Sequence, residues 1–140
     1  RKDLKEEQVE GKLHYRPFSE KQFIEDLASC RAVVAGAGFT TMSECVYLHK
    51  PLLAIPLKGQ FEQLLNARYL EREGFGVCAQ TIDDEILSQF LRKVGRYEDL
   101  LEKYSQKGNE VALQVLDEQI DRAAAGMYNS LTKRLKAFVA

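Results

Sequence analysis

The stretch that decides the fold is Ala32–Thr41, which reads AVVAGAGFTT. Its first four residues form a continuous apolar run, which is typical of a strand buried on both faces of a parallel sheet. Gly36-Ala37-Gly38 interrupts that run, and Thr40 or Thr41 offers a hydroxyl that can cap a following helix. The stretch therefore predicts a strand, a tight glycine turn and a helix.

The same alternation of strands and helices continues on both sides of this stretch. Strands are predicted at Lys12–Phe18, Ala32–Ala35, Leu52–Ile55 and Phe75–Ala79. Helices are predicted after Ser19, after Thr41, over Phe61–Glu73 and from Thr81 with Asp84 onward. Such an order favours right-handed crossovers and a mostly parallel sheet. We predict the α/β class, with a partial Rossmann-like parallel sheet of about four strands flanked by helices.

The length of 140 residues suits one domain. We predict a single domain over residues 1–140, with a mainly helical tail over 82–140 and a charged, solvated lead-in at Arg1–Gly11. A doubly wound sheet usually has five or six strands, so we expect the domain to be truncated on its N-terminal side. Residues at helical spacing predict the inward faces of the helices. They include Phe23, Ile24, Leu27 and Ala28, then Val111, Val115, Leu116, Ile120 and Ala124, and finally Leu131, Leu135 and Phe138.

Composition excludes several classes of function. The formal net charge of −1 argues against a strongly basic nucleic-acid binder and against a polybasic membrane anchor, so no nucleic-acid partner is expected. No stretch reaches the roughly 20 apolar residues that span a bilayer. The three cysteines, Cys30, Cys45 and Cys78, include no CxxC pair and suggest neither a zinc site nor a disulfide framework. Because they lie in apolar runs, we expect reduced thiols and a cytoplasmic location.

Three loops follow the predicted strands: Pro17–Ser19, Gly36–Thr41 and Pro56–Gln63. Ligands of open α/β sheets bind beyond the carboxyl ends of the strands, so we expect all three loops to line one binding edge.

The loop Gly36–Thr41 has the parts of a phosphate site. Glycine allows a positive φ and a close approach of the backbone, and the next helix presents free N–H groups to an anion. Thr40 and Thr41 can add hydroxyl donors. The dinucleotide fingerprint GxGxxG is not met, because Thr41 stands at the third glycine position. A plain strand-to-helix turn explains the same residues equally well.

Polar side chains near these loops each allow two interpretations. Glu44 can accept hydrogen bonds from ribose hydroxyls, or it can form a capping box with Thr41. Glu62 and Gln63 can bracket sugar hydroxyls, although Glu62 also suits a helix N-terminus. Asn66 can reach the same loop or face solvent. No residues have the spacing of metal ligands or of a Ser–His–Asp triad.

An ordered set of short motifs resembles a known family. The set comprises Gly36–Glu44, Lys50-Pro51, Ile55-Pro56, Glu62-Gln63 and Asn66-Ala67. It resembles the C-terminal donor-binding domain of GT-B glycosyltransferases, in the group of the MurG-type N-acetylglucosaminyl transferases and the UDP-glycosyltransferases. The resemblance covers about half of the chain, from His14 to Val77.

The resemblance implies a role for each matching position. In the family, the position of Phe18 packs beside the base, Gly38–Thr41 cradles the donor diphosphate, Glu44 holds the ribose and Glu62-Gln63 contacts the transferred sugar. The predicted donor-binding set is Phe18, Gly36, Ala37, Gly38, Phe39, Thr40, Thr41, Glu44, Glu62, Gln63 and Asn66. Many family members have a histidine where this chain has Gly36, so any phosphate contact there would come from the backbone.

The resemblance also implies an activity. The chain would bind a nucleotide-sugar, expected to be a UDP-sugar and a substrate rather than a cofactor, for transfer to an acceptor hydroxyl. The family's acceptor site and catalytic base lie in an N-terminal domain, so we expect no catalytic residue and no metal in this segment, and no activity of the segment alone. Two alternatives are a non-catalytic subunit of a two-chain transferase with a membrane-anchored partner, and a UDP-sugar 2-epimerase. A peripheral membrane contact of the parent protein is also compatible with the resemblance.

Overall fold

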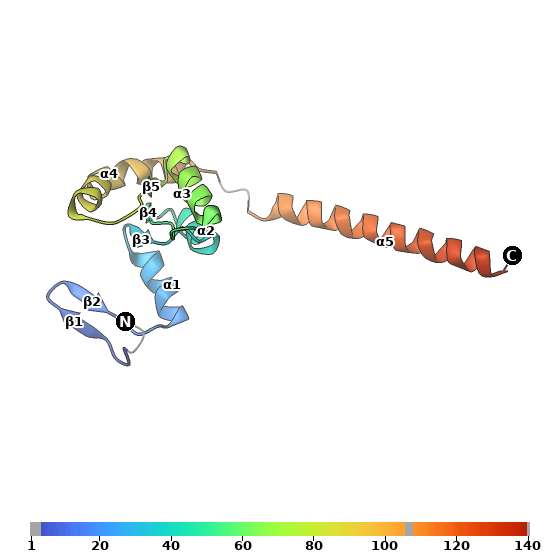
Figure 1. The fold of residues 1–140 in the computed structure, drawn as a ribbon, viewed down its shortest axis with the longest axis horizontal. Coiled ribbons are helices and arrows are strands. Elements are labelled where there is room, and N and C mark those ends of the chain that lie inside the picture. Colours follow the sequence, from blue (N-terminus) through green and yellow to red (C-terminus); the bar gives the residue numbers. More distant parts are fainter. Residues whose placement is uncertain (1–3, 106–107, 140) are drawn as a thin grey trace. The chain divides into compact units, whose positions relative to one another are not determined.

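The computed structural model describes residues 4–105 and 108–139, with side chains described as far as residue 126. The chain forms two compact units, Arg1–Tyr104 and Ser105–Ala140, which we call unit 1 and unit 2. Figure 1 labels the elements of both units. In chain order, unit 1 contains β1 (Gln8–Glu10), β2 (Leu13–Tyr15), α1 (Glu20–Ser29), β3 (Val33–Ala35), α2 (Phe39–Tyr47), β4 (Leu52–Ala54), α3 (Phe61–Glu73), β5 (Gly76–Cys78) and α4 (Asp84–Lys103).

A parallel sheet with the strand order β3-β4-β5 forms the centre of unit 1. Val33 pairs with Leu52, and Leu52 pairs with Gly76, so the three strands run in register. The predicted α/β class with a parallel sheet and flanking helices is confirmed. The sheet has three strands among the described residues, one fewer than the predicted number of about four.

The strand predicted at Lys12–Phe18 lies outside this sheet. Its central part, β2, pairs antiparallel with β1, and the turn between them contains Gly11 at a φ of 63°. Glycine at a positive φ is typical of such two-residue hairpin turns. Within the lead-in predicted at Arg1–Gly11, Gln8–Glu10 therefore forms β1, and its three residues are exposed, as expected of a solvated segment.

An ion-pair network joins the hairpin to α1. Arg16 pairs with Asp26 of α1 and also with Glu7, at 3.3 Å from Nε to Oε1. The Arg16 guanidinium lowers the pKa of the Asp26 carboxyl from its ordinary value, mainly through their hydrogen bond. These side chains remain solvent-accessible, so the network orients the hairpin against α1 but adds little to the free energy of unfolding of unit 1.

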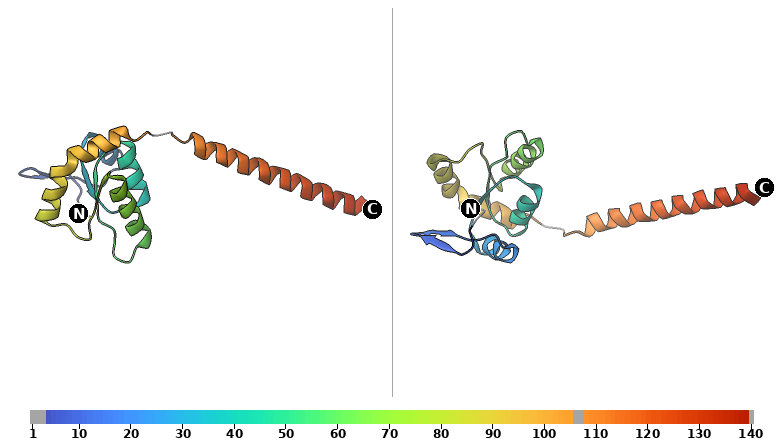
Figure 2. Two further views of the ribbon diagram at one scale, coloured as in Figure 1. Left: turned by 90° about the horizontal axis from the view of Figure 1, so that it is seen from above. Right: turned by 60° about the horizontal axis from the view of Figure 1, so that its bottom comes forward.

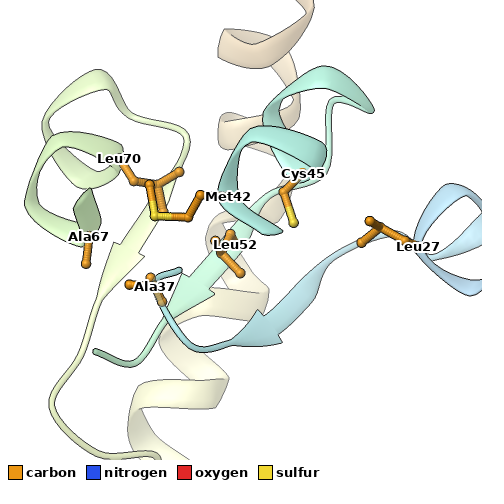
Figure 3. Packing of buried hydrophobic residues seen from close by; sticks show 8 residues of the cluster. Leu27, Ala37, Met42, Cys45, Leu52, Ala67 and Leu70 are labelled. Atoms are coloured by element: carbon orange, nitrogen blue, oxygen red, sulfur yellow. The ribbon is translucent and has the colours of Figure 1, made fainter. Parts of the chain in front are cut away.

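Helices cover both faces of the parallel sheet. The alternation along β4 sends Leu52 and Ala54 to one face and Leu53 to the other. The first face carries a cluster to which α1, α2 and α3 contribute, with members Leu27, Ala37, Met42, Cys45, Leu52, Ala54, Ala67 and Leu70 (Figure 3). The second face carries the cluster Leu53, Ala79, Phe90, Val94 and Tyr97, contributed largely by α4. Figure 2 shows the strands between α4 in yellow and the pair α2 and α3 in cyan and green.

Local sequence signals set several helix ends. Ser19 Oγ accepts from Gln22 N at 3.4 Å, which confirms Ser19 as the cap of α1. Gly74 ends α3 in the left-handed conformation at a φ of 78°. The cap of α4 is Asp83, which accepts from Ile86 N at 2.8 Å, so the predicted start at Thr81 is two residues early.

The residues from 82 onward are mainly helical but fall in both units. Helix α4 belongs to unit 1, while unit 2 contains α5 (Glu110–Val139). Val111, Val115, Leu116 and Ile120 are each about half exposed on α5. The predicted inward residues Leu131, Leu135 and Phe138 lie outside the described side chains. In the part of the chain that the structure describes, no helix combines the length and the apolar character needed to span a membrane.

Candidate functional site

The carboxyl ends of β3 and β4 bring two loops to one edge of the sheet. The strands are parallel, and Ala35 pairs with Ala54 at their last positions. The turn Gly36–Gly38 therefore leaves the sheet beside the loop Ile55–Gln60, and α2 and α3 begin after them. This is the edge at which open α/β sheets bind their ligands.

Helix α2 begins with an uncapped N-terminus. Its N-cap is Gly38, which has no side chain to accept a hydrogen bond. The first intrahelical bond runs from Met42 N to Gly38 O at 3.1 Å. The N–H groups of Phe39, Thr40 and Thr41 thus precede the regular bonding of the helix and are available to an anion.

The expectation that Thr40 or Thr41 caps α2 is wrong, because both residues lie in its first turn. The capping box of Thr41 with Glu44 is excluded for the same reason. Glu44 lies in the second turn and is half-buried, and no acidic residue occupies the first turn of α2. The positive end of the helix dipole is therefore not neutralised by a carboxylate within that turn.

The two glycines of the turn are not explained by backbone strain. Gly38 has a φ of −65°, and neither Gly36 nor Gly38 adopts the positive φ that glycine allows. A Cβ placed on Gly38 would meet no atom within 4 Å. Neither conformation nor packing within the chain therefore requires glycine at position 38. What its lack of a side chain provides is open space beside the helix N-terminus.

Two amide side chains of α3 hold the loops at this edge. Gln63 Oε1 accepts from Leu57 N at 3.0 Å, in the loop that follows β4. Asn66 Nδ2 donates to Ala37 O at 3.3 Å, in the turn that follows β3. Asn66 therefore contacts the turn after β3, so its side chain does not face solvent alone.

The remaining predicted residues differ in how the structure presents them. Phe39 and Glu62 lie at the exposed starts of α2 and α3, close in sequence to the two loops. Phe18 is fully exposed and follows β2 of the hairpin, not a strand of the parallel sheet. The reason for expecting Pro17–Ser19 at the binding edge is therefore wrong, and the role of Phe18 rests on the resemblance alone.

One residue of this edge was not singled out from the sequence. Lys58 lies exposed in the loop between β4 and α3. Its positive charge would add to the field that attracts an anion toward the start of α2. The signal was present in the sequence as a basic residue in a loop at the carboxyl end of a predicted strand.

A separate hollow of about 470 Å³ lies between β5 and α4. Its lining includes Cys78, Phe90, Lys93 and Tyr97, and burial raises the pKa values of Cys78 and Tyr97. None of the predicted donor-binding residues lines it. Among the described residues, no cluster of three or more histidine, cysteine, aspartate or glutamate side chains could hold a metal ion.

A family model and similar proteins both relate this chain to glycosyltransferases. Residues 1–95 match the model of the family described as glycosyl transferase family 1. The chain is 38% identical over 106 residues to the Bacillus cereus UDP-N-acetylglucosamine--N-acetylmuramyl-(pentapeptide) pyrophosphoryl-undecaprenol N-acetylglucosamine transferase 3. That match covers 72% of this chain and 29% of the relative.

A second similar protein comes from an archaeon. The chain is 29% identical over 89 residues to an uncharacterized glycosyltransferase of Methanosarcina mazei, covering 61% of this chain and 24% of the relative. The chain thus spans less than a third of the length of these curated relatives.

Proposed function

The chain belongs to glycosyl transferase family 1 and carries a GT-B glycosyltransferase domain, and from this premise we propose that unit 1 binds the nucleotide-sugar donor of a glycosyl transfer. The donor class that suits the edge described above is a nucleoside diphosphate sugar, and a UDP-sugar is the expected member. Membership of the family supports glycosyl transfer in general. The identity of the nucleotide and of the sugar in the donor is part of our proposal.

The observation that carries the proposal is the open N-terminus of α2. The chain leaves three N–H groups without regular intrahelical partners there, and position 38 has a glycine that its conformation and its packing do not require. A diphosphate carries the charge that such a helix start stabilises. When the sugar is transferred, negative charge develops on the departing diphosphate, and fixed backbone donors would stabilise it without reorganising.

Other residues at the edge suit the rest of the donor. Glu44 is half-buried one turn beyond the open N–H groups, where its carboxylate can accept hydrogen bonds from a ribose. Glu62 and Gln63 begin α3 across from this turn and can bracket the hydroxyls of the sugar. Phe18 remains the proposed neighbour of the base. None of these side chains is proposed as a catalytic residue.

Catalysis on this proposal needs a second component. The chain spans 29% of its Bacillus cereus relative, so the acceptor site and the base that activates the acceptor hydroxyl are proposed to lie in another part of a longer protein or in a partner chain. We expect unit 1 to bind the donor and to show no transferase activity without that component.

The proposal is tested by an amide NMR titration of this chain with UDP, with ADP and GDP as competitors of the same charge. We expect saturable shifts over residues 36–44, with UDP preferred. In the variant Gly38→Ala, the new Cβ occupies the open space beside the helix start, so UDP affinity should fall about tenfold or more, as when one charge-assisted contact is lost. The free energy of unfolding should fall by no more than about 1 kcal/mol, because φ and packing at position 38 tolerate alanine, although alanine is a poorer N-cap than glycine.

The matched control is Gly95→Ala in α4, a second glycine at which a Cβ meets no close neighbour. This variant should bind UDP like the wild type. Equal UDP affinity of Gly38→Ala and the wild type would refute the role of the α2 start. Shifts spread over α4 without shifts over residues 36–44 would assign nucleotide binding to a different surface.

A further inference from the structure

Asn66 is the only residue of the predicted donor-binding set whose side chain donates a recorded hydrogen bond to the glycine turn within the described residues. Its Nδ2 lies 3.3 Å from the carbonyl oxygen of Ala37, which is 29 positions earlier in the chain. We propose that Asn66 is a positioning residue, which fixes the turn Gly36–Gly38 and thereby directs the open N–H groups at the start of α2 toward the diphosphate, and which does not itself bind the donor. This inference rests on the proposed function of the edge.

The chemistry of the contact requires a donor on the side chain. A backbone carbonyl oxygen can only accept, so the amide of Asn66 must turn its NH₂ group toward Ala37. Ala37 is fully buried in the cluster of α2 and α3, together with Ala67, the neighbour of Asn66. A buried carbonyl that loses its partner is costly, so the contact resists rearrangement.

Because the peptide bond is planar, the hydrogen bond at the Ala37 oxygen also fixes the direction of the next N–H group. The carbonyl of Ala37 and the N–H of Gly38 belong to one trans peptide unit, in which they point in opposite directions. Holding the Ala37 oxygen toward Asn66 therefore directs the Gly38 N–H away from α3. Gly38 is also the N-cap of α2, so the same peptide unit sets the direction in which the helix starts.

The neighbouring amide of α3 has a complementary task. Gln63, one turn before Asn66, accepts from Leu57 N at 3.0 Å and thereby holds the loop after β4. Its Oε1 also lies 3.9 Å from the point that a Cβ of Gly36 would occupy. The first two turns of α3 thus brace both loops of the edge, and Asn66 is the member that contacts the turn itself.

The test uses the variant Asn66→Asp, which changes the donor into a group that titrates. As a carboxylate, the new side chain repels the Ala37 oxygen, and as a protonated acid it donates a hydrogen bond again. We expect UDP affinity relative to the wild type to fall about tenfold at about pH 8 and to recover to within about threefold at about pH 4, where about half of the new carboxyl groups carry a proton. Asn66→Ala should lose about tenfold at both pH values.

Other carboxylates near the edge do not confuse this comparison. Glu44 and Glu62 are present in the wild type and in the variants, and UDP itself titrates equally in every titration, so the ratio of affinities removes their contribution. The control Asn109→Asp makes the same chemical change at the start of unit 2, in a segment that supplies none of the residues of the edge. It should match the wild type at both pH values.

A measurement without nucleotide separates this inference from the proposed function. The amide resonances of Gly36 and Gly38 in Asn66→Asp should move toward their wild-type positions as the pH falls. If the wild type binds no UDP but this movement occurs, the proposed ligand is wrong and the positioning role stands.

Three results would overturn the positioning role. The first is UDP affinity in Asn66→Asp and Asn66→Ala that equals the wild type at both pH values. The second is glycine resonances in Asn66→Asp that do not respond to pH. The third is loss of folding in both variants at both pH values, which would show that the contact serves the stability of unit 1 as a whole.

Discussion

At the scale of single residues, burial decides the chemistry of Cys45. Its side chain is fully buried in α2, in the cluster that contains Met42 and Leu52 (Figure 3). Burial raises the pKa of its thiol from 9.0 to about 11, because the thiolate would lose its hydration. Cys45 therefore stays protonated at neutral pH and is a poor nucleophile, although it lies next to Glu44 of the proposed donor site.

This shift predicts a pH dependence of stability. The folded-state pKa of Cys45 lies above the unfolded value, so its contribution is complete below about pH 9 and is lost as the pH rises through about 11. At neutral pH, Cys45→Ala should lower the free energy of unfolding by roughly 1 kcal/mol, the cost of removing a small buried group. Denaturant unfolding of both proteins should show this difference shrinking in alkaline solution.

Lysines and tyrosines titrate in both of these proteins, so the difference between them isolates Cys45. A difference that stays constant up to about pH 11 would show that the thiol titrates normally in the folded state.

At the scale of elements, the spacing of strands β4 and β5 restricts residue 76 to glycine. Gly76 pairs with Leu52, and a Cβ on Gly76 would overlap the backbone carbonyl of Leu52. Neither backbone group can move without breaking the parallel register. Gly95 in α4 is the opposite case, since a Cβ there would meet only Glu98 Oε2 at an ordinary contact distance of 4.0 Å.

Alanine at these two glycines should therefore have effects of opposite sign. Gly76→Ala should lower the free energy of unfolding by about 1–3 kcal/mol, as for other overpacked sites. Gly95→Ala should raise it by about 0.5–1 kcal/mol, because glycine is unfavourable inside a helix. Thermal and denaturant unfolding measure both changes. A loss of stability in Gly95→Ala would show that α4 needs glycine for a reason other than open space.

At the scale of the whole molecule, unit 1 contains both clusters of buried side chains found among the described residues. Their members extend from Leu27 to Tyr97, and Leu101 is the last fully buried residue. In unit 2, every side chain described between residues 108 and 126 is exposed. The hydrophobic stabilisation that can be assigned to this chain thus belongs to unit 1.

Removal of residues 105–140 should therefore leave unit 1 folded. We expect the shortened chain to unfold cooperatively, with a free energy of unfolding within about 0.5 kcal/mol of the full chain, as for changes outside a core. Circular dichroism should show the loss of the helical signal of α5. Absence of a cooperative transition in the shortened chain would mean that unit 1 depends on unit 2.

The sequence predicted best those features that depend on neighbouring residues. The bounds of α3 agree with the predicted helix Phe61–Glu73, because Gly74 supplies the left-handed residue that ends it. Inward faces were predicted less well. Leu27 of α1 is buried as expected, but Phe23 and Ile24 on the same predicted face are about half exposed. Helical spacing shows that a face is apolar, whereas the neighbouring elements decide which part of it is covered.

The candidate site also has features that depend on neighbouring residues and features that depend on the packing of elements. The order of strand, glycine turn and helix at Ala32–Thr41 follows from the sequence, because apolar runs and glycine act on adjacent residues. The motifs that resemble the family are also present in the sequence alone, and the family match confirmed that membership.

Only the tertiary structure decided which segments meet. The alternation at Lys12–Phe18 predicted a strand, but its expected place in the parallel sheet was wrong, because the structure pairs it with β1 in a hairpin. The contact of Asn66 with Ala37 joins residues 29 positions apart. A strand exposes the same backbone groups to any partner, and an amide can bond to any carbonyl, so such pairings are fixed by the packing of whole elements and not by the local sequence.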